Sequence, residues 1–485
     1  HINNCDNATT IFNLENNMIY KRDPNTNQLV KNRFTGVSSY GNAPIDGSNI
    51  GNVTYLSRSD FKKTFPKEVT YLPLNKIVSL RDYIYTGYDN VSMPTQGQNG
   101  NLRLWFKEDK TNPSKADLEM YSKTKLVANE ELIKTLANRS NFNKSEIWDP
   151  LLNQISKAEL CDLVEKSGFR TRAIESIGKK ELLDYDGPEG FQYHFGSITG
   201  GASWTAYMSE QTLACTFNKE LAFSMGRSIA SEGNATGING WYAPGVNLHR
   251  TPYTGRYFEY YSEDAFLSGS MASYVINGAK TNFMYCYLKH FALNPTENHR
   301  NYLYNWCTEQ ALRETYLKSF QKAIQVADCM GLMTSYGRAG ICYTGGSEAL
   351  IEGVARTEWG FKGVIVTDYS YDNKFMNIDH GIRAGNDLGM GSKLNFLGAD
   401  YNFNYTETAT PRIQRQLKKA IKHAAYAYLH TQCINKAWNE YVKEHPDQGE
   451  TIDSAVLIDS WNWWKPTVLA IDIMVGCGIA CFCYS

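Results

Sequence analysis

The stretch Gly363-Val-Ile-Val-Thr-Asp368 carries the clearest structural signal in the chain. Its β-branched residues favour a buried strand, and a single carboxylate stands where that strand ends. Similar short apolar runs that end in polar or glycine clusters occur at 240–247, 283–290, 330–336 and 385–390. This repetition predicts a series of buried strands, each with polar residues at its carboxyl end.

Amphipathic helix patterns, such as residues 309–320, lie between these runs. Strands that alternate with helices predict a parallel α/β sheet with crossover connections. Over about 250 residues, the closed (β/α)8, TIM-like barrel is the expected architecture. A doubly wound open sheet is the alternative, although the chain has no GxGxxG turn to support a dinucleotide site.

The flanking regions differ from this alternating part. An Asn/Gly/Thr-rich start predicts loops and short strands, and helical spacing begins near residue 115. The predicted organisation begins with a connecting region at 1–110, followed by a barrel domain at 111–440. A linker at 441–465 then leads to an apolar helix at 466–485.

The run 466–485 is 20 mostly apolar residues long and follows Trp461, Trp463, Trp464 and Lys465. That length just crosses a bilayer, and the tryptophans resemble an interfacial belt. We therefore expect a transmembrane helix that holds an extracellular catalytic part at the cell membrane. A buried terminal helix is the alternative, and Asp472 within the run would be costly at mid-membrane.

Composition excludes several classes of function. With 49 basic and 50 acidic residues the net charge is -1, so no nucleic-acid partner is indicated. The 11 cysteines lack a CxxC pair or a Cys/His ligand spacing, and thiols such as Cys215 and Cys286 are expected to be buried. We expect neither a metal nor a cofactor.

The predicted strand ends supply the candidate site residues. They are Asp186, Arg256, Lys289, His290, Tyr336, Asp368 and Asp387. In a barrel such residues share one face, and a carboxylate that nearby cations keep ionised can act as a nucleophile. Charged donors and acceptors also suit a polyhydroxylated substrate. A strand-end Asp is equally a common helix N-cap, so position alone leaves both interpretations open.

Ordered motifs add a resemblance. The stretches 244–264, Lys289-His290-Phe-Ala-Leu-Asn294, Met333-Thr-Ser-Tyr336, 358–368 and 384–390 resemble glycoside hydrolase family 3, the β-glucosidase and β-xylosidase family. The resemblance implies hydrolysis of terminal non-reducing β-D-glycosides, above all β-glucosides, by retaining double displacement.

The same resemblance implies the roles of the residues. Asp368 would be the nucleophile, with its partner carboxyl group ~5.5 Å away. Asp186, Arg256, Lys289 and His290 would bind the sugar, and Tyr336 would lie beside the nucleophile. Tyr369, Gly337 and Pro295 depart from the family pattern, which has Trp, Asn and a polar residue at these positions.

The acid/base residue is the open question. In the β-glucosidase branch it usually comes from an α/β sandwich domain, and this chain resembles a reversed-order member that lacks its N-terminal sandwich. We therefore expect a missing acid/base domain or a second chain as partner. His299 is the alternative, as in the β-N-acetylglucosaminidase branch, although Glu297 and Arg300 better match a loop-bracing pair of the glucosidase branch.

Two other readings of the chain stay open. It could be a sugar-binding pseudo-enzyme or an incomplete fragment that keeps the sugar site without turnover. It could also be a phosphate-using barrel, which the lack of a glycine-rich loop after the late strands disfavours.

Overall fold

The computed structural model describes a defined part of the chain, all of it within the unit His1–Ile452 and none within the second unit, Asp453–Ser485. The described residues are 22–23, 25–30, 33, 125–126, 130–192, 204–250, 254–298, 300, 303–305, 307, 309–339, 342–369, 376, 378–390 and 411–448.

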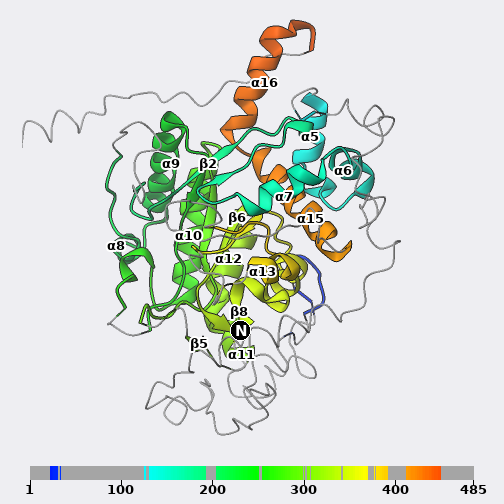
Figure 1. Cartoon of the computed structure of the whole chain (residues 1–485). Coiled ribbons are helices and arrows are strands. Elements are labelled where there is room, and N and C mark those ends of the chain that lie inside the picture. The colour runs from blue at the N-terminus through cyan, green and yellow to red at the C-terminus, as the bar shows by residue number, and fades with distance from the viewer. Residues whose placement is uncertain are drawn as a thin grey trace, which may run out of the picture. The chain divides into compact units, whose positions relative to one another are not determined.

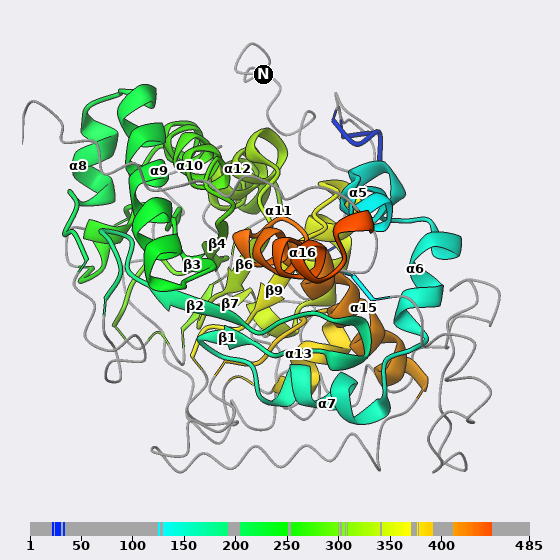
Figure 2. The same cartoon turned by 90° about the horizontal axis from the view of Figure 1, so that it is seen from above.

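A curled six-stranded sheet forms the centre of the described residues, with strand order β1-β2-β3-β4-β6-β9 (Figures 1 and 2). The strands are β1 (Arg170–Thr171), β2 (Leu182–Asp186), β3 (Gly240–Tyr242), β4 (Tyr285–Phe291), β6 (Gly331–Thr334) and β9 (Val364–Val366). From β2 to β9 each strand pairs in parallel with the next. A parallel bridge between Val366 and Leu388 extends the series. The strands predicted at 240–247, 283–290, 330–336 and 363–368 therefore form in the predicted order, whereas the run 385–390 contributes only the bridge at Leu388.

The expected architecture is confirmed as α/β, but the complete (β/α)8 barrel goes beyond what the described residues contain. Within the described residues the sheet also differs from an all-parallel barrel, because β1 pairs antiparallel with β2. Only a 3₁₀ turn, η5 (Glu175–Ile177), lies between these two strands. A parallel pair needs a crossover of a dozen or more residues, so this short connection forces the antiparallel pairing.

Three helices pack on one face of the sheet: α9 (Lys219–Thr236), α10 (Ala265–Lys280) and α12 (Lys318–Ala327) (Figure 2). Alternate strand residues meet them, among them Trp241 and Ile365. Helices α9 and α10 approach closely because glycines line their contact. A Cβ on Gly278 would lie 2.0 Å from the Phe223 carbonyl oxygen.

The opposite strand residues form a second core with α7 (Lys157–Glu165) and α15 (Pro411–Tyr428). This core is partly polar. Asp184 is fully buried and accepts hydrogen bonds from Tyr285 Oη at 2.5 Å and Tyr287 Oη at 3.2 Å. Burial raises the pKa of Asp184 to about 6 despite these bonds.

The remaining described elements are α5 (Glu130–Ala137), η4 (Arg139–Asn141), α6 (Ser145–Leu152), α8 (Glu210–Cys215), η6 (Tyr257–Glu259), α11 (Glu309–Ala311), the π-helical η8 (Leu312–Tyr316) and η10 (Ala349–Glu358), η9 (Thr344–Gly346), α13 (Ile378–Ala384), α16 (Gln432–Glu444), η11 (Pro446–Gln448), and a small sheet β5-β7-β8 of Tyr304–Asn305, Arg338–Ala339 and Cys342–Tyr343. Helices α5 to α7 fall in the region where helical spacing was predicted.

Several sequence predictions concern residues that the structure does not describe. The candidate transmembrane helix 466–485 lies outside the described residues, as do residues 449–465 of the predicted linker, most of region 1–110 and His299. The first residues of the predicted linker, 441–448, are described and contain the end of α16 and η11. Within the part that is described, no helix is long and apolar enough to cross a membrane. Cys286 is buried as expected, but the prediction for Cys215 was wrong, because this thiol stands exposed near the end of α8.

Candidate active site

The sequence-predicted residues lie at the carboxyl ends of neighbouring parallel strands. Asp186 ends β2 and Lys289 and His290 lie within β4. Tyr336 follows β6, Asp368 follows β9, and Arg256 comes from the connection between β3 and α10. Because the strands are parallel, these ends share one edge of the sheet.

Lys289 is the buried cation of this edge, only 1% exposed. Its ammonium lies 2.7 Å from Asp186 Oδ1 and 3.3 Å from Glu259 Oε2. Burial opposes its charge, but the two carboxylates raise the pKa of Lys289 above its ordinary value. Lys289 is therefore held as a cation that fixes both carboxylates.

His290 is held in one tautomer by its two neighbours. Its Nε2 lies 2.9 Å from Arg256 Nη2, and its Nδ1 lies 3.0 Å from Tyr260 Oη. A guanidinium can only donate, so Nε2 accepts and Nδ1 carries the proton. Burial, and then the charges of Arg256 and Lys289, lower the pKa of His290 well below its usual value. The ring is therefore neutral.

The Asp368 carboxylate lies against this group. Its Oδ2 is buried without a hydrogen-bond partner, 3.7 Å from His290 Nε2, while Oδ1 accepts from the Tyr369 backbone N–H at 2.7 Å. Since His290 Nε2 has no proton to give, Oδ2 keeps its lone pairs available. Burial raises the pKa of Asp368 to about 6, although the charges of Arg256 and Arg300 oppose this rise.

Arg300 and Glu297 complete the wall beside Tyr336. Arg300 Nη1 lies 2.6 Å from Glu297 Oε2, and its guanidinium stacks 4.1 Å from the centre of the Tyr336 ring. Tyr336 Oη in turn donates to the Tyr369 carbonyl at 2.6 Å. The expected Glu297–Arg300 pair thus forms, and it supports the aromatic ring next to the nucleophile candidate.

Sequence reasoning missed one residue of this group and misjudged another. Glu259 pairs with both Arg256 and Lys289, and its position three residues after Arg256 was the available signal. Asp387 was a strand-end candidate, but it is buried away from the site. Its carboxylate binds Arg356 Nη2 and His423 Nδ1, each at 2.7 Å.

A curled, largely parallel α/β sheet with a buried carboxylate among cations at its carboxyl edge is an arrangement that suits a barrel-type hydrolase. The family follows from comparison. Residues 181–390 match the model described as glycosyl hydrolase family 3 N terminal domain, so this part of the chain is similar to that family.

Curated relatives agree with this assignment. A putative beta-glucosidase of Schizosaccharomyces pombe is 31% identical over 293 residues, which cover 59% of this chain and 34% of the relative. Beta-glucosidase A of Butyrivibrio fibrisolvens is 33% identical over 250 residues, or 51% of this chain and 28% of the relative. The chain thus spans about a third of the length of these relatives.

Solved structures show the same similarity. Beta-glucosidase 3B of Thermotoga neapolitana, in complex with glycerol, has a TM-score of 0.51 and 26% identity, and the match covers 59% of this chain and 46% of that one. The beta-glucosidase of Kluyveromyces marxianus in complex with glucose has a TM-score of 0.51 and 25% identity, over 57% of this chain and 33% of that one.

Proposed function

We propose that this chain binds the terminal sugar of a β-glucoside and attacks its anomeric carbon with Asp368. The observation that carries the proposal is Asp368 Oδ2, a buried carboxylate oxygen without a hydrogen-bond partner at a strand end that cations surround. The β-glucosidases to which the chain is similar support the choice of a glucoside.

The proposed reaction is a retaining double displacement. Asp368 forms a C–O bond to the anomeric carbon as the bond to the aglycon oxygen breaks. Water then attacks the same carbon, and the Asp368 carboxylate leaves. We assign Asp186 and Lys289 to the sugar hydroxyls, because a hydrogen-bonded pair of opposite charge offers both an acceptor and a donor. Arg256 and His290 complete this binding set, and Tyr336 forms the wall beside the nucleophile.

Protonation of the leaving oxygen needs a second group. Asp186, Glu259 and Glu297 each contact a cation, so we do not assign this role to them. We assign proton donation to a group outside the described residues, on a further domain or a second chain. General acid catalysis contributes about 10²–10⁴-fold. Glucosides of alkyl alcohols should therefore react slower than activated aryl glucosides by about that factor in this chain alone.

An activated fluorosugar tests the nucleophile without needing the acid. With 2-deoxy-2-fluoro-β-glucosyl fluoride, which loses fluoride, we expect one 2-deoxy-2-fluoroglucosyl group to accumulate on the peptide that contains Asp368. Peptide mass spectrometry locates it, and Asp368→Asn is the matched control. Azide should then speed the turnover of an aryl β-glucoside and yield the β-glucosyl azide.

The outcomes separate the alternatives. Sugar binding without any labelling would favour a sugar-binding pseudo-enzyme over the proposed hydrolase. Labelling of a residue other than Asp368 would overturn the nucleophile assignment itself.

A further inference from the structure

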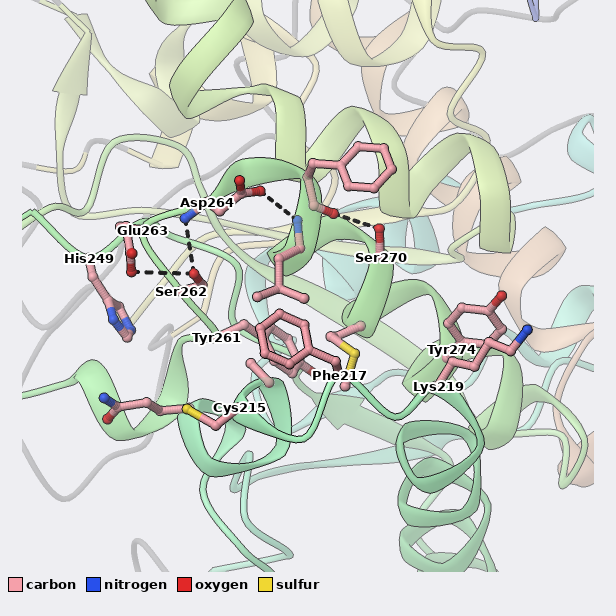
Figure 3. A pocket seen from close by; sticks show the side chains of 15 residues that line it. Cys215, Phe217, Lys219, His249, Tyr261, Ser262, Glu263, Asp264, Ser270 and Tyr274 are labelled. Carbon is pink, nitrogen blue, oxygen red and sulfur yellow. Dashed lines mark hydrogen bonds between the residues drawn. The ribbon is translucent and has the colours of Figure 1, made fainter.

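A groove outside the active site runs between α8, the start of α10 and residues 261–264 (Figure 3). Its volume is about 720 Å³, within the roughly 300–1,000 Å³ of typical small-ligand sites. Buried residues of the main core, Tyr261, Ala214 and Met271, form part of its lining. Part of the groove floor is therefore formed by the packed core, which fixes its shape.

Aromatic side chains at this groove are unusually exposed. The exposed fractions are 74% for Phe217, 64% for Phe266 and 37% for Tyr274. Two of the rings make cation–π contacts with lysines. Lys322 Nζ lies 4.0 Å from the centre of the Phe266 ring, and Lys219 Nζ lies 5.9 Å from the centre of the Tyr274 ring. Exposed apolar side chains gathered at one hollow mark a binding surface.

Phe217 also adopts a left-handed backbone conformation that disfavours any residue with a Cβ. It follows the end of α8, where its N–H bonds to the Ala214 carbonyl at 3.0 Å, and its φ is 52°. Glycine is the usual residue at such a left-handed helix end, because a Cβ makes the conformation costly. The exposed ring recovers little of this cost through packing. A role in binding explains why an aromatic residue occupies this position.

The rest of the lining narrows the chemistry of the ligand. Glu263, Asp264 and Lys219 give the groove mixed charges, which do not favour a polyanion. Gln211 and Glu263 add hydrogen-bonding groups to the lining of the groove. Pyranose rings present apolar C–H faces to aromatic rings and hydroxyls to polar groups, so this alternation fits a carbohydrate.

We propose that this groove is a second carbohydrate site, which binds a β-glucan chain away from Asp368. The choice of a glucan rests on the proposed function, but binding here needs no turnover. The groove would keep a polymeric substrate attached while its ends reach the active site.

Affinity electrophoresis of the full chain in native gels with a soluble mixed-linkage β-glucan tests the proposal. We expect the wild type and Lys289→Met to be retarded equally, because Lys289 serves the active site. Phe217→Gly should bind at least several-fold more weakly, without a lower melting temperature, and Phe266→Ala should also weaken binding. Val326→Ala, which alters an exposed residue of α12 outside the groove, is the matched control.

Three results would overturn the proposal. They are no retardation of the wild type, equal retardation of Phe217→Gly, and loss of retardation in Lys289→Met alone. Self-association that Phe217→Gly abolishes would instead assign the groove to a second copy of the chain. If the fluorosugar labels nothing while Phe217-dependent retardation persists, the proposed function fails and the glucan site stands.

Discussion

Burial and nearby charges shift the pKa of Asp368 in opposite directions. Burial raises the pKa of this carboxyl to about 6 from an ordinary 3.8, and the nearby arginines only reduce the rise. The folded state therefore disfavours the ionised form, although the proposed reaction needs it. We expect the rate of fluorosugar labelling to fall as the pH drops below about 6. His290, whose pKa burial lowers well below its usual value, should contribute no second limb near neutral pH.

The same shift predicts a gain in stability on substitution. Because the pKa of Asp368 is higher in the folded than in the unfolded state, its ionisation destabilises the fold progressively as the pH rises from 3.8 to about 6. Asp368→Asn removes this cost and should raise the free energy of unfolding by roughly 1–3 kcal/mol at pH 7.5. The gain should shrink at pH 4.5. Urea unfolding at both pH values measures it, and a less stable variant at pH 7.5 would contradict the assignment.

At the scale of elements, strand β9 enters the sheet through a glycine. A Cβ on Gly363 would lie 2.0 Å from the Met330 carbonyl oxygen, which is backbone and cannot turn aside. Gly337 is constrained in the same way, since a Cβ there would lie 2.1 Å from the Leu293 carbonyl oxygen. A side chain at Gly337 would therefore have to displace the backbone at Leu293.

Gly363→Ala should consequently destabilise the protein by about 1–3 kcal/mol or more, because it forces β9 away from β6. Gly255→Ala is the matched control, since no atom lies within 4 Å of its added Cβ. Thermal unfolding of the two variants measures the difference. Equal melting temperatures would show that β9 can move without cost.

At the scale of the whole molecule, residues of the segment around 22–33 form hydrogen bonds with helices that are some 300 residues away in sequence. The Arg33 guanidinium binds the buried carboxylate of Glu358, and its backbone N–H lies 3.1 Å from Glu309 Oε1. Arg313 contacts the same two carboxylates. The N-terminal segment thus shares an ion-pair network with the core domain.

Arg33→Met should cost about 1.5–3 kcal/mol of stability, the value of a hydrogen bond to a charged group. The cost stays in this range because Arg313 still pairs with Glu358. Arg22→Met is the control, since Arg22 donates within its own segment, to the Asn27 carbonyl. Urea unfolding should distinguish the two variants. Identical midpoints would mean that the network does not hold the segment.

The sequence by itself determined the order of strands and helices and the residues that end each strand. Alternating apolar runs and amphipathic stretches are local patterns, so the strands at 240–242, 285–291, 331–334 and 364–366 were predictable. The motifs around Asp368 likewise indicated the family without coordinates. The antiparallel β1 was missed, because pairing direction depends on the length of a connection that the periodicity did not reveal.

Only the tertiary structure decided which charged strand ends work together. Asp368 and Asp387 both lie next to apolar strand segments. Arg356 and His423 bind the Asp387 carboxylate inside the fold, whereas Asp368 Oδ2 is left without a hydrogen bond. The aromatic groove at Phe217 also emerged only from packing. The physical reason is that charge pairing and exposure depend on distances between residues far apart in the chain, which no local pattern encodes.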